Sequence, residues 1–455
     1  MSASAARKIA FEALRRVEAE GAYASDVLHA ELGANIKPAD AELATELTLG
    51  VLRWRRLLDF LLDQQLKKPV ATLDLAVAIA LRMGLYQLRY LGKIPARAAV
   101  NESVELVKLA RKSSAASLVN AVLRRLSADA RKPAEEIVSP EPAPADRLAI
   151  IHSHPTWMVK RWLARLGEER TVALLHANNR APRLSCVLHA PERRDEILRS
   201  LEKAGLRIEP GTVLAQAFAV CGGSPAMTEA FRKGWISIQD EASQAVPLLL
   251  DVQAGDRVLD LCAAPGGKTA PLARAAGGGL VVAADRHAHR LRAMRAQFER
   301  LDLTGVSLVE LDATRELPFR AAFNKILVDA PCSGTGTLAR HPEIRWRLKP
   351  KQLAEFHQLQ VAMLREALEN LAPRGRLVYS TCSMEPEENE EAIEEVLDKA
   401  QNVRRVSQDT VRRALEPHLA LGIEARALLD SLGQFRTFPG EHRSDGFFAA
   451  LLHKE

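Results

Sequence analysis

Three stretches in the second half of the chain pair a strand-like apolar run with residues of chemical interest. One run enters the glycine-rich loop at residues 262–268 and then a helix. The runs at 326–332 and 377–382 each end in a cysteine, Cys332 and Cys382. A loop with glycines lets a ligand approach the backbone closely, and the carboxyl ends of parallel strands share one edge of a sheet. This pattern predicts an α/β sheet with a nucleotide-like cofactor at the strand ends and two thiols aimed at it.

From about residue 241 onward, apolar strand-like runs alternate with helical patterns. Such alternation predicts a doubly wound, mainly parallel sheet. We expect strands at 257–262, 280–285, 306–311, 325–330 and 375–380, and helices at 287–301, 351–371 and 387–400. A last strand at 447–452 follows Gly446, and we expect it to close the sheet.

The loop after the first strand narrows the choice of cofactor. The loop ends in Gly-Lys-Thr, as the phosphate-binding motif Gly-x-x-x-x-Gly-Lys-Thr does. The position of the first glycine of that motif is occupied by Cys262, so the motif is not present. The Gly-x-Gly-x-x-Gly pattern of dinucleotide folds is also absent. Asp285, at the end of the second strand, is placed for a ribose diol, and Asp312 could accept from an adenine amine. A carboxylate-lined site poor in phosphate contacts suits S-adenosylmethionine, which is cationic and carries no phosphate.

The two cysteines indicate covalent chemistry on a pyrimidine. Carbon 5 of a pyrimidine is too weak a nucleophile to take a methyl group, but a thiolate added at carbon 6 activates it. One thiol suffices for that addition, and a second can act as acid, base or release group. A single cysteine at a strand end is more often buried and inert. Two at the ends of one sheet favour catalysis, and chemistry alone leaves open which of them attacks.

The first 240 residues divide into a helical part and a mixed part. Residues 1–130 carry apolar side chains at three- and four-residue spacing, which predicts a helical bundle. Its many basic residues are read either as solvated helix faces or as a surface for RNA phosphates. Residues 131–147 hold four prolines and predict a semi-rigid linker. Residues 148–240 mix helix and strand patterns, as in a small α+β subdomain, with strands at 184–189 and 235–239.

Composition excludes several classes of protein. A chain of 455 residues is too long for one ordinary core. Its five cysteines, with no Cys-x-x-Cys pair, argue against a disulfide framework or a zinc cluster and for a reducing cytosol. The first residues lack a secretory signal, and the longest apolar stretch, 71–88, carries Asp74 and Arg82. We therefore expect a cytoplasmic protein without a membrane or metal partner. The net charge of +6 fits a polyanionic partner.

Two sets of motifs resemble known families. Residues 46–53, 57–59 and 119–124 resemble the NusB family, which implies an RNA-binding helical bundle. The motifs at 260–269, 329–336 and 381–383, with 386–389, resemble the RNA cytosine-5 methyltransferases of the NOP2/Sun type. Arg345-Trp346 and residues 445–448 also fit. Together the resemblances cover nearly the whole chain, and the arrangement is similar to bacterial enzymes that methylate 16S rRNA.

The resemblance implies a role for each matching position. Cys382 would be the nucleophile, and Cys332 would assist product release. The implied S-adenosylmethionine-binding residues are Cys262, Ala263, Ala264, Pro265, Gly266, Gly267, Lys268, Asp285, Asp312 and Asp329. Asp329 could also bond the cytosine edge, whereas Cys262 is expected to contribute its backbone rather than its thiol.

The expected protein therefore has several domains. They are an all-α NusB-like bundle (1–130), a proline-rich linker (131–147), a small α+β RNA-binding subdomain (148–240) and an α/β Rossmann-like class I methyltransferase domain (241–455). Its partner would be 16S rRNA, naked or in an assembly intermediate, and we expect a monomer. Two alternatives remain: the same chemistry on another RNA such as tRNA, and a non-enzymatic NusB-like RNA-binding factor. The intact thiols and glycine loop speak against the second.

Overall fold

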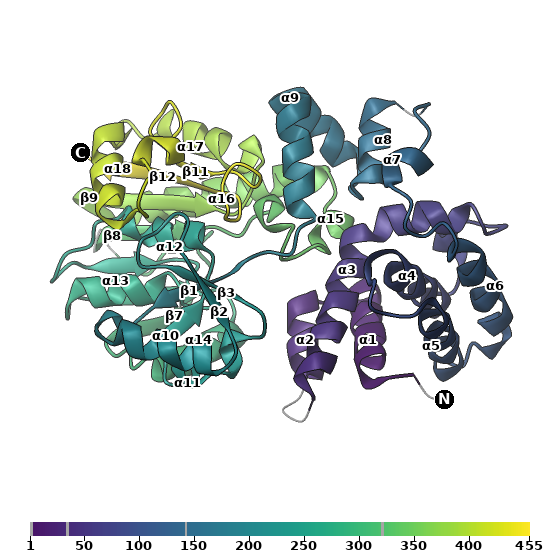
Figure 1. Cartoon of the computed structure of the whole chain (residues 1–455). Coiled ribbons are helices and arrows are strands. Elements are labelled where there is room, and N and C mark those ends of the chain that lie inside the picture. Colours follow the sequence, from purple (N-terminus) through teal and green to yellow (C-terminus); the bar gives the residue numbers. More distant parts are fainter. Residues whose placement is uncertain (1–2, 33–35, 142, 320–322) are drawn as a thin grey trace. The chain divides into compact units, whose positions relative to one another are not determined.

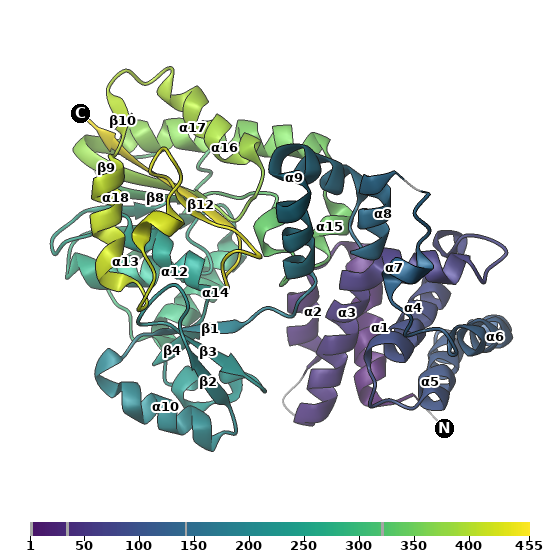
Figure 2. The same ribbon diagram turned by 45° about the horizontal axis from the view of Figure 1, so that its top comes forward.

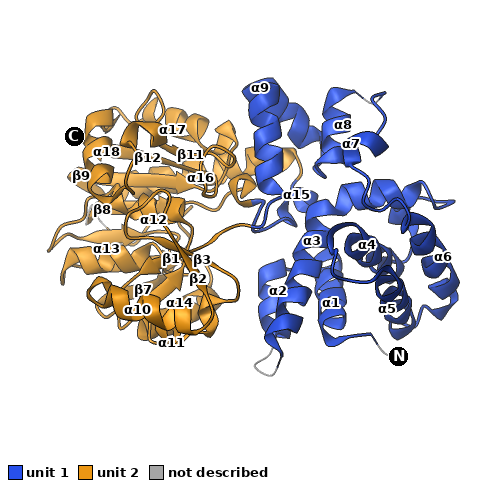
Figure 3. Ribbon diagram, viewed as in Figure 1, with its two compact units in different colours: residues 1–181, 338–348 blue, residues 182–337, 349–455 orange. Residues whose placement is uncertain are grey.

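A computed structural model describes residues 3–32, 36–141, 143–319 and 323–455 (Figure 1). The chain forms two compact units (Figure 3). Unit 1 comprises residues 1–181 and 338–348, and unit 2 comprises residues 182–337 and 349–455. The segment 338–348 thus packs with the helices of unit 1, although its sequence lies within that of the sheet domain. The four-part division by sequence remains a proposal.

Within unit 1, the described residues up to 130 form the predicted helical bundle around an apolar core. Its helices are α1 (Ala5–Glu20), α2 (Ala24–Glu31), α3 (Pro38–Asp63), α4 (Leu75–Tyr90), α5 (Ala96–Leu109) and α6 (Ala116–Leu126). α4 is buried on all sides from Ala76 to Leu88. Its one buried cation, Arg82, is paired with Asp59 at 2.6 Å and with Glu18 at 3.0 Å, so the charge does not stand alone in the core.

The expected linker at 131–147 contains more helix than its prolines indicated. α7 (Ala134–Ile137) and the beginning of α8 (Pro144–Ile151) fall within it. Pro133 caps α7 and Pro144 opens α8, positions at which a missing N–H group costs nothing. α9 (Thr156–Asn178) follows, with a break at Gly167, and the inserted segment adds the short helix α15 (Ile344–Arg347). Prolines here begin helices rather than prevent them.

Unit 2 begins with a small antiparallel sheet in the order β2-β3-β1-β4 (Figure 2). Its strands are β1 (Leu184–Leu188), β2 (Arg207–Pro210), β3 (Phe218–Cys221) and β4 (Ile236–Ile238), and its helices are α10 (Arg194–Lys203) and α11 (Glu229–Arg232). The α+β prediction is confirmed, although only β1 and β4 were expected as strands. β2 and β3 have four residues each, too few to show clear alternation.

The second sheet has the order β10-β12-β9-β8-β5-β6-β7, with β11 paired to β12. Its strands are β5 (Val258–Asp260), β6 (Val281–Asp285), β7 (Val306–Glu310), β8 (Phe323–Asp329), β9 (Leu371–Thr381), β10 (Val403–Arg405), β11 (Phe435–Thr437) and β12 (Phe447–Lys454). The five strands from β5 to β9 are parallel, as predicted, and the last three are antiparallel. β12 does not close the sheet as expected, because β10 extends it beyond β12.

Helices cover both faces of this sheet. They are α12 (Glu241–Leu248), α13 (Thr269–Ala276), α14 (Ala288–Arg300), α16 (Lys351–Asn370), α17 (Glu390–Leu397) and α18 (Gln408–Leu415). Leu259, Ile326 and Leu377 join the core that α16 and α17 cover, and their neighbours Val258 and Leu327 join the core beneath α12 and α13. The two-residue period of the strands thus fills two cores. Within the described residues, no helix is long and apolar enough to cross a membrane.

Candidate active site

The loop after β5 depends on glycine. Gly266 has a φ of +99°, and a Cβ added there would lie 2.7 Å from Cε1 of Phe298. The Gly266 amide donates to the carbonyl of Ala263, and the Ala263 amide donates to the carbonyl of Ala284 on β6. The loop is therefore a tight turn fastened to the neighbouring strand, with its backbone open to a ligand.

Carboxylates stand at the carboxyl ends of four parallel strands. Asp260 ends β5, Asp285 ends β6, Asp312 follows β7, and Asp329 ends β8. Asp285 accepts from the amide of His287 at 2.9 Å. Asp312 accepts from the Thr314 hydroxyl at 2.6 Å, which holds its pKa below the usual value. Three of these residues, Asp285, Asp312 and Asp329, were predicted from sequence, and all four lie at the same edge of the sheet.

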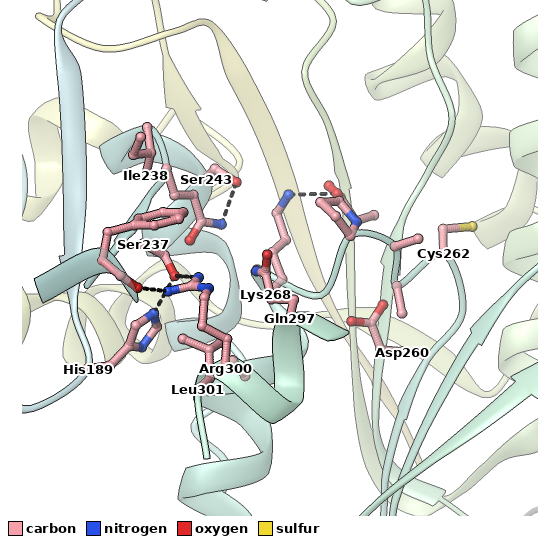
Figure 4. Close-up of a pocket in the computed structure, with 18 residues that line it drawn as sticks. His189, Ser237, Ile238, Ser243, Asp260, Cys262, Lys268, Gln297, Arg300 and Leu301 are labelled. Carbon is pink, nitrogen blue, oxygen red and sulfur yellow. Dashed lines mark hydrogen bonds and ion pairs between the residues drawn. The ribbon is translucent and has the colours of Figure 1, made fainter. Parts of the chain in front are cut away.

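Cys262 has a thiol that is poorly suited to nucleophilic chemistry. Its sulfur points away from the other labelled side chains in Figure 4 and lies 3.9 Å from Sδ of Met363 on α16. Burial, and then the charges of Asp260, Asp329 and Asp285, raise the pKa of this thiol. A thiol held protonated among carboxylates is a poor nucleophile.

A cavity of about 300 Å³ lies against the loop (Figure 4). Its lining includes Cys262, Ala263, Ala264, Pro265, Gly267, Lys268 and Asp329. The small sheet supplies His189, Ser237 and Gln239 on the other side. Gly266, Asp285 and Asp312 are not among the lining residues, so the cavity gathers only part of the predicted cofactor-binding set.

Asp260, which sequence reasoning passed over, also lines this cavity. Its Oδ2 accepts from the Thr269 hydroxyl at 2.7 Å, while its buried Oδ1 has no protein partner. Burial raises the pKa of this carboxyl to about 7. An unpartnered buried carboxylate oxygen favours a ligand with a donor or a positive charge. The lining also holds the cations Lys268 and Arg300, and Lys268 is paired with Asp329. Asp260 is therefore the lining carboxyl group that fits a donor or a positive charge on a cofactor.

Asp329 lies at the centre of a polar cluster. Nζ of Lys268 is 2.6 Å from Oδ2 of Asp329, and the Ser380 hydroxyl donates to its Oδ1 at 2.7 Å. Lys268 Nζ also lies 5.2 Å from the centre of the Phe447 ring. Ser380 had no role assigned from sequence; its position beside Asp329 follows from the parallel register of β8 and β9.

The two predicted thiols lie together. Sγ of Cys332 is 3.4 Å from Sγ of Cys382. Asp329 on β8 pairs with Ser380 on β9, so the two strands end level and the residues that follow meet. The hydrogen bond with Cys382, and then burial, raise the pKa of the Cys332 thiol. Either sulfur could be the donor of this hydrogen bond.

Comparisons with known proteins agree with this geometry. The model of the 16S rRNA methyltransferase RsmB/F family matches residues 247–453, and the NusB family model matches residues 4–128. The RsmF/B-like ferredoxin-like domain model matches residues 154–225. The probable ribosomal RNA small subunit methyltransferase B of Bacillus subtilis is 32% identical over 463 residues, covering 100% of both chains. The chain belongs to the RsmB/F family.

Other relatives and solved structures extend this family assignment. Ribosomal RNA small subunit methyltransferase B of Pseudomonas putida is 36% identical and covers 98% of each chain. The crystal structure of PH0851 shares the fold over 100% of both chains, with a TM-score of 0.81 at 24% identity. A methyltransferase homolog from Pyrococcus horikoshii is 30% identical, with a TM-score of 0.56, over 69% of this chain and 100% of its own. The expected NusB and NOP2/Sun-type resemblances are confirmed, and this RsmB/F-family member is a 16S rRNA methyltransferase.

Proposed function

We propose that the enzyme transfers a methyl group from S-adenosylmethionine to carbon 5 of a cytosine in 16S rRNA, through a covalent bond between Cys382 and the base. The observation that carries this proposal is the pair of thiols 3.4 Å apart at the ends of two neighbouring parallel strands. Methyl transfer to an exocyclic nitrogen or a ribose oxygen needs no sulfur nucleophile. Two adjacent thiols favour a carbon that must first be activated.

The addition step falls to Cys382. Its thiolate bonds to carbon 6 of the cytosine, and the electron pair of the 5,6 double bond makes carbon 5 nucleophilic. S-adenosylmethionine, when bound, supplies the electrophilic methyl group that carbon 5 takes. Asp329, whose carboxylate is held by Lys268 and Ser380, would bond the cytosine edge.

The release step falls to Cys332. Its pKa is raised chiefly by the hydrogen bond with Cys382. Once Cys382 is bonded to carbon, that sulfur no longer carries charge, so Cys332 gives its proton to water more easily. The Cys332 thiolate then removes the proton from carbon 5. The freed electron pair re-forms the 5,6 double bond and expels the Cys382 thiolate, which restores both sulfurs.

The cofactor would lie along the strand ends. The backbone of residues 262–268 would hold it, with Asp285 on the ribose and Asp312 on the adenine. The unpartnered Oδ1 of Asp260 in the cavity lining supports a ligand that brings a donor or a positive charge. The glycine turn supports the close approach of a ligand to the backbone.

The RNA must present an unstacked cytosine to the thiols. The NusB-family match over residues 4–128 supports binding of RNA by the helices of unit 1. We infer that the substrate is 16S rRNA, naked or in an assembly intermediate, and that the enzyme acts as a monomer in the cytoplasm.

Nucleoside analysis tests the proposal. The purified protein is incubated with methyl-labelled S-adenosylmethionine and small-subunit rRNA, with tRNA in a parallel reaction. Label in 5-methylcytosine from rRNA is the expected result. Label in another nucleoside would overturn the two-thiol chemistry, and label in tRNA alone would keep the chemistry but replace the substrate.

A further inference from the structure

One buried carboxylate contacts the residue that follows each thiol. Glu388 lies in the turn Pro386–Glu388 after β9, and its side chain is fully buried. Ser333 follows Cys332, and Ser383 follows Cys382. The Ser383 hydroxyl donates to Oε1 of Glu388 at 2.6 Å, and the Ser333 hydroxyl donates to the same oxygen. The Ser333 amide donates to Oε2 at 2.7 Å.

Gln360 on α16 completes the hold on the Cys332 loop. Its Nε2 donates to Oε2 of Glu388 at 3.1 Å and to the carbonyl of Pro331 at 2.9 Å. Cys332 is therefore held on both sides, through Pro331 before it and Ser333 after it.

Asn389, the residue after Glu388, holds the Cys382 loop in the same way. The Thr381 hydroxyl donates to Oδ1 of Asn389 at 2.5 Å, and Nδ2 of Asn389 donates to the carbonyl of Ser383 at 2.9 Å. With Glu388 on the Ser383 hydroxyl, the residues before and after Cys382 are both fixed.

Charged acceptors make stronger hydrogen bonds than neutral ones, and a buried carboxylate with four donors resists displacement. Each serine has one hydroxyl hydrogen, and both serines donate it to Oε1 of Glu388. Glu388 therefore holds the side chains of Ser333 and Ser383 close to each other. Their Oγ atoms lie 3.1 Å apart. The thiols beside them lie 3.4 Å apart.

We propose that Glu388 is the positioning residue that sets the distance between Cys332 and Cys382. It touches neither substrate nor cofactor and acts through Ser333 and Ser383. The inference rests on the proposed roles of the two thiols. Residues 386–389 stood out in the sequence as part of a family resemblance, but no role followed from the sequence itself.

The test compares Glu388→Gln with Glu391→Gln. Glutamine keeps the size of Glu388 but replaces one acceptor oxygen with a donor. Glu391 is an exposed residue of α17, so its variant controls for the loss of a negative charge. Turnover is measured with labelled S-adenosylmethionine, and thiol proximity is measured as the rate at which diamide forms the Cys332–Cys382 disulfide.

Glu388→Gln is expected to slow turnover about tenfold to a hundredfold, because displacements near 1 Å cost that much in a catalytic pair. Disulfide formation should slow several fold, with KM and cofactor binding close to wild type. The thermal midpoint should fall, because the amide NH2 of glutamine leaves buried donors unpaired. Glu391→Gln should match wild type in every measurement.

A folded Glu388→Gln enzyme with wild-type crosslinking would overturn the proposal, whatever its turnover. If this variant does not fold, Ser383→Ala and Ser333→Ala each remove one donor and leave the carboxylate its other partners; unchanged crosslinking in both would overturn it equally. If wild-type enzyme forms no 5-methylcytosine while crosslinking still depends on Glu388, the positioning role stands and the proposed chemistry fails.

Discussion

At the scale of single residues, the different roles proposed for the two thiols predict different failures when each is replaced. Cys382→Ala should abolish methyl transfer, because the proposal makes Cys382 the nucleophile that adds to carbon 6 and Cys332 the group that acts in release. Cys332→Ala should allow addition and methyl transfer but stall release. Denaturing electrophoresis with labelled RNA should then show a persistent protein–RNA adduct for Cys332→Ala and none for Cys382→Ala. Normal turnover by Cys382→Ala would contradict the assignment.

Asp260 gives a prediction for the pH dependence of stability. Burial raises its pKa from 3.8 to about 7, so the folded protein holds this proton more tightly than the unfolded chain. The stabilisation is complete below pH 4 and is lost as pH rises toward 7. At about 1.4 kcal/mol per pKa unit, the loss amounts to ~4 kcal/mol. Asp260→Asn should therefore gain stability relative to wild type over this range.

Urea unfolding of the ligand-free protein between about pH 4.5 and about pH 8 measures the difference in stability between Asp260→Asn and wild type. Asp398→Asn, a change at an exposed position, is the matched control and should follow the wild-type curve. If the free energies of unfolding of Asp260→Asn and wild type change with pH in parallel, Asp260 does not cause the loss of stability.

At the scale of elements, the segment 338–348 is fastened to the helices of unit 1 by a buried arginine. Arg345 is fully buried, and burial lowers its pKa. Its guanidinium donates to the carbonyls of Ser153 at 3.1 Å and Asn178 at 3.0 Å, and to Oδ1 of Asn179 at 2.9 Å. Trp346 adds a bond from its indole nitrogen to the carbonyl of Leu52 at 2.6 Å.

Arg345→Lys tests this anchor. Lysine keeps the charge but cannot reach three acceptors in a planar fork, so it leaves buried carbonyls unpaired. The free energy of unfolding should fall by about 3 kcal/mol, typical of breaking a buried charged network. Arg125→Lys, at an exposed position of α6, should change it by less than ~0.5 kcal/mol. Denaturant titration measures the free energy of unfolding of both variants. If Arg345→Lys is as stable as wild type, the three hydrogen bonds of the Arg345 guanidinium do not stabilise the protein.

At the scale of the whole molecule, the net charge of +6 and the NusB-family match predict salt-dependent RNA binding. RNA affinity should fall about tenfold or more between low and moderate salt, because bound counterions are released from phosphates. S-adenosylmethionine has no phosphate, so its affinity should change little over the same range. Titrations of both ligands at a series of salt concentrations check this; equal salt dependence would argue against a phosphate-tracking surface.

The sequence by itself determined the large pattern of the protein. Short continuous apolar runs, each ended by an aspartate or followed by a cysteine motif, were sufficient to predict β5, β6, β8 and β9 and their shared edge. The glycine loop and the two cysteines pointed to the cofactor and the chemistry. These features are local, since strand period, turn residues and motif spacing are written in neighbouring positions.

Only the tertiary structure decided the rest. The short strands β2, β3, β10 and β11 have too few residues for a clear period, and they exist because neighbouring strands offer hydrogen-bond partners. Glu388 looked like one glutamate among several until packing buried it against Ser333 and Ser383. Segment 338–348 joined the helices because Arg345 finds its acceptors there. Such contacts join residues far apart in the chain, and local sequence preferences do not encode them.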